Sequence, residues 1–274
     1  ALVTATGDYV RKSGFTDVGL GLSGGIDSAL VATVAVDALG ADHVHVVLMP
    51  SRYSSEHSVV DAEELATSLG IDTLTVPIES AHTALGSELV SSIAGTLTSV
   101  ADENLQARIR GVMLMSLANT FDWLVLTTGN KSEAAVGYST LYGDTVGAYA
   151  PIKDVYKTVV YELVRWRNER DGAPVVPVSI VEKAPSAELR PNQRDDDSLP
   201  RYEVLDPLLE AYIEGDRTRV ELVSDGFDAD LVEEVVRLVD RAEFKRRQNP
   251  PGVRVTQKGF GRDRRLPLVN RYRG

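Results

Sequence analysis

The stretch that decides the fold is Val18-Gly19-Leu20-Gly21-Leu22-Ser23-Gly24-Gly25-Ile26-Asp27-Ser28. It begins with a short apolar run, Val18–Leu22, and passes through a glycine-containing turn. An Ala- and Val-rich segment, Ser28–Leu39, follows and stops at a glycine, which is typical of a buried helix. His43–Met49 is then rich in β-branched residues and stops at a proline. We therefore predict a strand, a turn, a helix and a second strand at the start of the chain.

The same alternation of strands and helices continues beyond this unit. Two further apolar runs predict strands: Ile71–Val76 and Trp123–Thr127. Spacing or composition predicts helices over Glu56–Leu69, 80–95, 103–120, Asp154–Glu169, Pro207–Glu214 and Ala229–Arg247. Three segments are predicted to be irregular: Gly137–Ile152, Pro174–Pro200 and 249–274. The pattern predicts an α/β fold with a doubly wound, mainly parallel sheet and flanking helices. Ligands bind beyond the carboxyl ends of the strands in such sheets.

Composition narrows the class of protein. The 274 residues are 43% hydrophobic and 25% charged, which is ordinary for a globular protein, and we predict a single domain. No apolar run approaches the roughly 20 residues of a membrane-spanning helix, and we see no secretion leader, so we expect a cytoplasmic protein without membrane contact. Cysteine is absent, which excludes disulfides and thiol nucleophiles. The net charge of −11 argues against general nucleic-acid binding.

Charge is unevenly distributed along the chain. Residues 241–274 hold eleven Lys and Arg against two Asp and Glu, so a basic C-terminal tail follows an acidic body. Such a tail places its cations either beside an anionic ligand or in solvent, and the sequence leaves both interpretations open.

The glycines after the first predicted strand also allow two interpretations. Gly19–Gly24 matches the G-x-G-x-x-G pattern of dinucleotide-binding loops, which requires an acid near the end of the second strand. That strand ends Leu48-Met49-Pro50-Ser51, without an acid. Ser23–Ser28 instead offers close backbone approach, two hydroxyls and a helix N-terminus, which are the features of a phosphate cradle. The alternative to a phosphate cradle is a purely structural role, in which the segment is a tight turn before an ordinary helix cap.

The residues around this loop refine the type of phosphate site. The pattern G-x-x-x-x-G-K-[ST] is absent, so the loop is not of the Walker type. Asp27 inside an anion cradle implies a bound cation, and we predict Mg²⁺. Glu133 follows the predicted strand Trp123–Thr127, so its segment starts at the same sheet edge, and its carboxylate is a candidate second ligand. The alternative is that Ser132 and Glu133 merely begin a helix.

Ser23–Ser28 resembles the signature loop of the N-type ATP pyrophosphatases, which adenylate a carbonyl or carboxylate oxygen and share an adenine nucleotide alpha hydrolase-like fold. Four further segments resemble motifs of one member family, the NAD synthetases. They are Glu103–Arg110 (E-N-x-x-A-R-x-R), Pro151–Lys157, Lys183–Leu189 (K-x-P-[ST]-A-[DE]-L) and Glu243–Arg246 (E-H-K-R). Five motifs in this order are more specific than any one of them.

The resemblance implies a ligase that depends on ATP and Mg²⁺. It would amidate deamido-NAD (nicotinic acid adenine dinucleotide) with ammonia through an acyl-adenylate, giving NAD, AMP and pyrophosphate. The alternative is another adenylating ATP pyrophosphatase, either amidating or tRNA-modifying. The chain departs from the bacterial family pattern at Leu141, Ala148 and Phe244, where Lys, Asp and His are common.

The resemblance also implies roles for individual residues. The ATP phosphates would be held by Gly21, Leu22, Ser23, Gly24, Gly25, Ile26, Asp27 and Ser28. ATP would also contact Thr128, Ser186 and the catalytic Lys157. Mg²⁺ would be held by Asp27 and Glu133. Deamido-NAD would contact Arg108 and Lys245. Asp144 is the second catalytic candidate, because it would position ammonia or accept its proton.

The resemblance bears on partners as well. Glutamine-using members carry a separate amidase domain with a cysteine nucleophile. Because this chain has no cysteine and no room for such a domain, we expect it to use free ammonia; the alternatives are a separate glutaminase partner or a sequence that is part of a longer chain. Residues 80–120 offer a helical face for a homodimer, as in the family, whose dinucleotide site lies between two subunits.

Overall fold

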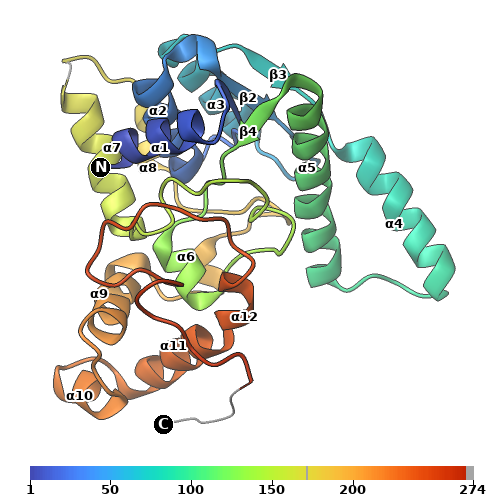
Figure 1. Cartoon of the computed structure of the whole chain (residues 1–274). Coiled ribbons are helices and arrows are strands. Elements are labelled where there is room, and N and C mark those ends of the chain that lie inside the picture. Colours follow the sequence, from blue (N-terminus) through green and yellow to red (C-terminus); the bar gives the residue numbers. More distant parts are fainter. Residues whose placement is uncertain (171, 270–274) are drawn as a thin grey trace.

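The computed structural model describes residues 1–170 and 172–269. At its centre lies a four-stranded parallel sheet with the order β3-β2-β1-β4 (Figure 1). The strands are β1 (Asp17–Gly21), β2 (Val44–Leu48), β3 (Thr73–Thr75) and β4 (Trp123–Val125). The strand order reverses between β1 and β4, which makes their carboxyl ends the topological switch point. The predicted α/β fold with a parallel sheet is confirmed.

Helices cover both faces of the sheet, as a doubly wound fold requires. One side is covered by α1 (Leu2–Lys12), α2 (Ile26–Leu39), α3 (Glu56–Leu69), α7 (Lys157–Arg170) and α8 (Val178–Glu182). The other side is covered by α5 (Ser99–Phe121). Successive residues of a strand point to opposite faces. In β2, Val46 and Leu48 therefore join the larger hydrophobic cluster, whereas Val47 packs with the residues of α5.

Glycine alternates with apolar residues in β1 because large side chains cross one of its faces. Val18 and Leu20 are fully buried in the larger cluster. A Cβ on Gly19 would lie only 2.8 Å from Cε3 of Trp123 in the neighbouring strand. The first glycine of the apparent G-x-G-x-x-G pattern is therefore explained by packing against Trp123.

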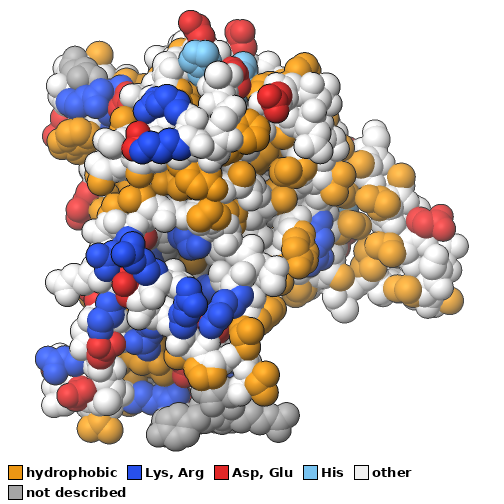
Figure 2. Space-filling model, viewed as in Figure 1, with side chains coloured by type: hydrophobic (Ala, Val, Ile, Leu, Met, Phe, Trp, Pro, Cys, Tyr) orange, Lys and Arg blue, Asp and Glu red, His pale blue; other side chains and the backbone are white. Residues whose placement is uncertain are grey.

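An arm of two helices projects from the body of the protein (Figure 1). It consists of α4 (Glu79–Ile93) and the α5 helix beside it. Hydrophobic side chains gather along this arm on the visible face (Figure 2). Those that are at least 38% exposed include Leu85, Leu89, Val90, Ile93, Val100 and Val112. Within residues 1–170 and 172–269, no helix is both long and apolar enough to cross a bilayer.

A second hydrophobic cluster lies below the sheet in Figure 1. It is built by α6 (Lys131–Val136), α9 (Tyr202–Ile213), α10 (Arg219–Ser224) and α11 (Ala229–Arg241). The short α12 (Glu243–Arg246) follows α11. Two 3₁₀ turns, Ala41–His43 and Asp195–Asp197, complete the described elements. Residues 249–269 then run back across α6 as an irregular strap.

The predicted elements are largely present, with shifted ends. Helix Glu56–Leu69 has the predicted bounds, whereas the helix predicted from Asp154 begins at Lys157. The helix predicted over Ala229–Arg247 is two helices, α11 and α12. Helices α1, α8 and α10 were not predicted, and α6 corresponds to the alternative interpretation, in which Ser132 and Glu133 begin a helix. The last residues of the basic tail, 270–274, lie outside the described residues.

Candidate active site

A cavity of about 520 Å³ opens beyond the carboxyl ends of β1 and β4, where the fold places a ligand. Most of the predicted site residues line it. They are Gly21, Leu22, Ser23, Gly24, Gly25, Ile26, Asp27, Ser28, Thr128, Glu133, Asp144, Lys157, Ser186 and Lys245. Arg108 is the exception, because it does not line this cavity. The structure therefore brings together predicted residues from segments more than 200 positions apart, and their roles stay predictions.

The loop after β1 has the geometry of an anion cradle. Gly24 adopts a φ of 73°, and a Cβ there would lie 2.1 Å from the backbone oxygen of Ser58, so only glycine fits. The hydroxyls of Ser23 and Ser28 lie 3.1 Å apart across the turn. Among residues 1–170 and 172–269, no side chain caps α2, whose N-cap residue is Gly25. The first amides of α2 thus keep their capacity to bind a phosphate, which favours the cradle over an ordinary capped turn.

A lysine and two carboxylates meet at the mouth of this cradle. The Lys157 ammonium contacts the Asp27 carboxylate closely and lies 3.3 Å from Oε1 of Glu133. Asn130 donates from Nδ2 to the other oxygen of Asp27 at 2.9 Å. The Asn130 side chain also accepts from the backbone N–H of Glu133 and forms a capping box at the start of α6. Glu133 therefore lies in the first turn of a helix, as the structural alternative predicts, and it also lines the cavity.

Burial and charge shift the acidities of this group. Burial is the largest influence on Glu133 and raises its pKa to about 8, although the Lys157 charge acts in the opposite direction. Desolvation lowers the pKa of Lys157, but Asp27 and Glu133 outweigh it, so the net shift is upward and Lys157 stays charged. Burial also raises the pKa of Asp195, a third carboxylate that lines the cavity. Within the described residues, Oδ1 of Asp195 has no hydrogen-bond partner.

These side chains fit a magnesium ion that a nucleotide brings with it. When ionised, Asp27 and Glu133 carry one more charge than the Lys157 ammonium that they share, and they stand beside a loop shaped for phosphates, which favours a further cation there. Among the described residues, no three acidic or histidine side chains are arranged to hold a metal ion by themselves. Mg²⁺ is commonly bound by one or two carboxylates together with substrate phosphates, which matches the pair Asp27 and Glu133.

Comparison with known proteins agrees with this geometry. Residues 1–249 match the family described as NAD synthase. The chain belongs to the NAD synthase family. It is 52% identical over 280 residues to the glutamine-dependent NAD(+) synthetase of Rhodobacter capsulatus, covering 100% of this chain and 51% of that protein. The chain spans about half the length of the curated relatives it matches.

Solved structures of NAD synthetases share its fold. The glutamine-dependent NAD+ synthetase of Acinetobacter baumannii, in complex with ADP, is 48% identical with a TM-score of 0.66, covering 98% of this chain and 48% of that one. The NH3-dependent NAD synthetase of Campylobacter jejuni is 28% identical with a TM-score of 0.71, covering 91% of this chain and 95% of that one. The NMN synthetase of Francisella tularensis is 29% identical with a TM-score of 0.75, covering 89% and 92%.

Asp144 and Lys245 also line the cavity. The Asp144 carboxylate accepts from the backbone N–H of Thr140 at 2.6 Å. Asp144 is an exposed residue that lines the cavity, and desolvation of its carboxyl by neighbouring protein atoms raises its pKa to about 6. Lys245 donates from Nζ to the carbonyl oxygens of Gly137 and Ser139, both at 2.7 Å. A cation and an acid thus face the same space.

Arg110 lines the cavity, whereas the predicted residue Arg108 does not. Arg108 is exposed and donates from Nε to the backbone oxygen of Leu141. Two residues along a helix turn the side chain by about 200°, and Arg110 consequently lines the cavity and donates to the Met49 oxygen. Burial lowers the pKa of Arg110 to about 10. The predicted role of Arg108 stays a prediction, and the sequence motif that contains both residues did not single out Arg110.

The 183–189 loop closes one side of the cavity. Lys183 donates from Nζ to Ser58 Oγ at 2.9 Å and pairs with Asp61 at 2.6 Å. Glu188 accepts from the hydroxyls of Ser55 and Ser58 at 3.0 and 2.6 Å. These bonds fasten the loop to α3. The predicted ATP contact, Ser186, is exposed and lines the cavity from this loop.

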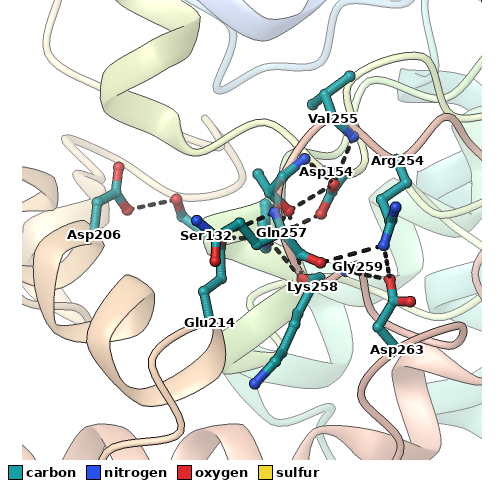
Figure 3. Close-up of polar contacts among 12 residues, drawn as sticks. Ser132, Asp154, Asp206, Glu214, Arg254, Val255, Gln257, Lys258, Gly259 and Asp263 are labelled. Carbon is teal, nitrogen blue, oxygen red and sulfur yellow. Dashed lines mark hydrogen bonds and ion pairs between the residues drawn. The ribbon is translucent and has the colours of Figure 1, made fainter.

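A buried ionic cluster connects α6 with Asp154, Glu214 and the C-terminal strap (Figure 3). Lys131, which is fully buried, donates from Nζ to Glu214 at 3.0 Å and lies 2.9 Å from Asp154. It also donates to Thr256 Oγ1 and the Lys258 carbonyl oxygen, which belong to the C-terminal strap. Of the described basic residues of the tail, only Lys245 lines the cavity. The strap therefore holds α6 in place and does not supply a set of ligand-binding cations.

Proposed function

We propose that this chain adenylates and amidates deamido-NAD, using ATP, Mg²⁺ and ammonia and giving NAD, AMP and pyrophosphate. One observation carries the proposal: the uncapped cradle of α2 opens into the same cavity as Asp27, Glu133 and Lys157. Membership of the NAD synthase family supports it. The chain spans about half the length of its glutamine-dependent relatives, so the activity of the whole relatives is proposed for this chain and not established.

Activation of the substrate comes first. A nicotinate carboxylate oxygen attacks the α-phosphorus of ATP, a P–O bond to pyrophosphate breaks, and an acyl-adenylate forms. Charge that develops on the phosphates would be stabilised by the backbone amides of the cradle and by the Lys157 ammonium. Removal of a preorganised donor of this kind from an active site costs about 10²–10³ in kcat. Asp27 and Glu133 would hold Mg²⁺, which would supply further charge neutralisation on the phosphates.

Amidation follows at the carboxyl carbon of the acyl-adenylate. Ammonia attacks the acyl carbon, AMP leaves with the electron pair of the C–O bond, and the nitrogen loses a proton. We propose that Asp144 accepts that proton or holds the incoming ammonium, since the raised pKa of its carboxyl lies close to neutrality. This chain contains no cysteine, so a thiol-dependent release of ammonia from glutamine must come from outside it.

The experiment is a substrate screen with the purified chain. ATP, Mg²⁺, ammonium and deamido-NAD are expected to give NAD, AMP and pyrophosphate in equal amounts. Separate arms replace deamido-NAD by its mononucleotide counterpart and ammonium by glutamine. Turnover of the mononucleotide alone would move the assignment to another amidating enzyme. Absence of adenylation in every arm, with the protein shown to be folded, would refute the proposal.

We further propose that the α4–α5 arm packs against a second copy of the chain. Its exposed hydrophobic side chains, among them Ile93 and Val112, are costly to leave in water. Sedimentation equilibrium is expected to give twice the chain mass at micromolar concentration. Val112→Glu is expected to shift the protein to monomers, and a wild-type protein that stays monomeric would contradict the proposal.

A further inference from the structure

Asp206 lies outside the cavity, yet it holds the starts of two helices that face it. It comes from α9, in the second hydrophobic cluster, and is only 3% exposed. Its Oδ1 accepts from the Ser132 hydroxyl at 2.5 Å (Figure 3). Its Oδ2 accepts from the backbone N–H and the hydroxyl of Thr158 at 2.8 and 2.9 Å. Both carboxylate oxygens are therefore used.

Ser132 extends this contact to the catalytic lysine. Its hydroxyl donates to Asp206 and accepts from the backbone N–H of Lys157 at 2.9 Å. Ser132 directly precedes Glu133 in α6, and Lys157 is the first residue of α7. One hydroxyl thus joins the two helical turns that carry Glu133 and Lys157.

The first amides of a helix have no acceptor within the helix. Ser132 and Asp206 supply the acceptors for the first two amides of α7, those of Lys157 and Thr158. A carboxylate at this end is also favoured by the helix dipole. A lysine side chain is long and flexible, so its ammonium keeps one place between two carboxylates most readily when its backbone is fixed.

We propose that Asp206 is a positioning residue for adenylation: acting through Ser132, it fixes the Lys157 backbone so that the ammonium stays between Asp27 and Glu133. The inference rests on the proposed function. It also gives α9 a part in the reaction, because Asp206 connects the second hydrophobic cluster to the phosphate site. Asp206 itself touches no substrate.

The test compares four variants for kcat, KM for ATP and thermal midpoint. Asp206→Ala and Ser132→Ala remove the connection, and Ser132→Ala changes too little volume to prevent folding. Both are expected to lower kcat on the order of 10- to 100-fold, as misplacement of a catalytic group does. Asp206→Asn keeps an acceptor for Thr158 and is expected to recover most of that loss. Asp37→Ala is the control, because Asp37 binds Arg167 near the far end of α7. It should lower the thermal midpoint and leave kcat unchanged.

A double-mutant cycle separates positioning from general stability. If Asp206 acts through Lys157, Asp206→Ala lowers kcat in the wild-type background and has little further effect in Lys157→Gln. The loss of thermal midpoint should remain in both backgrounds. Equal losses of kcat in the two backgrounds, or an unchanged kcat in Ser132→Ala, would overturn the inference. A wild-type chain without NAD formation would instead refute the proposed function, so the two failures are distinct.

Discussion

The ammonium of Lys157 contacts the carboxylate of Asp27, although 130 residues separate them in the chain. Asp27 stands in the first turn of α2, beside the anion cradle, and Lys157 begins α7. The two helices pack on the same side of the sheet, and their N-termini point toward one place. This ion pair therefore marks the point where nucleotide phosphates and the reacting carboxylate are expected to meet.

Replacement of Lys157 by glutamine should remove a cation from the transition state while retaining a polar side chain. We expect kcat for NAD formation to fall about 10²–10³-fold. Lys153→Gln is the matched control, since this lysine lies in the same connecting segment, donates to the Pro250 oxygen and does not line the cavity. Steady-state rates of NAD formation measure both. If Lys157→Gln kept the wild-type kcat, Lys157 would have no catalytic role.

Replacement of Glu133 by glutamine should weaken the use of Mg²⁺. Glutamine has nearly the same shape but no charge, so half of the proposed carboxylate pair is lost. The Mg²⁺ concentration for half-maximal rate is expected to rise at least tenfold at fixed ATP. Glu162→Gln, on the exposed surface of α7, should leave the titration unchanged. Identical Mg²⁺ titrations of Glu133→Gln and wild type would contradict the ligand assignment.

The cradle and the sheet edge were predictable because each rests on local sequence. Gly24 requires a left-handed conformation, and its neighbours form the start of a helix, so the loop is visible in a short window. Asn130 and Asp195 were missed as site residues for a different reason. Their roles arise from contacts made across the fold, with Asp27 and with the Lys157 charge. The nearest local signals were the capping pattern Asn130-x-x-Glu133 and the run of three aspartates.

The helices, too, divide into those that local sequence predicts and those that depend on tertiary contacts. Helix Glu56–Leu69 has its predicted bounds: the spacing and Gly70 predict it, and in the structure Ser55 caps its start while Gly70 ends it in a left-handed conformation. In α10, a capping box from Thr218 to Glu221 was an available signal, but six residues are too few for a periodic pattern. The helix expected from Asp154 begins three residues later, and the Asp154 carboxylate instead accepts from the strap residues Val255 and Thr256. Such a contact depends on tertiary structure and leaves no periodic trace.

The pH dependence of amidation should carry the signature of Asp144. Its carboxyl has a pKa raised to about 6, so it is a charged base above that pH and a neutral acid below it. Asp144→Asn keeps the acceptor for Thr140 but cannot take a proton. We expect the ratio of wild-type to Asp144→Asn kcat/KM for ammonia to rise with pH through about 6 and then level off. Taking the ratio cancels the change in free ammonia, and a ratio that is flat with pH would exclude Asp144 as the base.

The same group predicts a direction for stability. Because its pKa is higher in the folded protein than the usual 3.8, the folded state holds the proton more tightly than the unfolded state. The stability that this proton contributes is complete below about 3.8 and is lost as pH rises through about 6. Asp144→Asn should therefore gain stability relative to wild type across that window. Urea denaturation at several pH values measures the difference, and a gain confined to low pH would contradict the shift.

Loss of the buried Lys131 cation should lower the free energy of unfolding more than loss of a surface ion pair does. Lys131→Met leaves Asp154 and Glu214 without their shared cation, and removal of one partner from a buried pair costs about 3–5 kcal/mol. Lys258→Met breaks a contact with Asp216, which is 64% exposed, and should cost at most about 1 kcal/mol. Urea denaturation followed by circular dichroism compares the two variants. Equal losses would mean that the buried cluster adds nothing beyond a surface pair.

Substitution of Gly24 should damage nucleotide binding through geometry alone. Gly24→Ala places a Cβ 2.1 Å from the Ser58 oxygen at a φ of 73°, so either the loop or α3 must move. Because the cradle amides belong to that loop, we expect at least a tenfold rise in KM for ATP together with a lower thermal midpoint. Gly86→Ala is the control, because among the described residues no atom beyond its chain neighbours and the backbone of its own helix lies within 4 Å of the new Cβ, and alanine favours the interior of α4. It should leave KM unchanged and raise stability by up to about 1 kcal/mol. If Gly24→Ala bound ATP as tightly as wild type, the loop after β1 would not be the phosphate site.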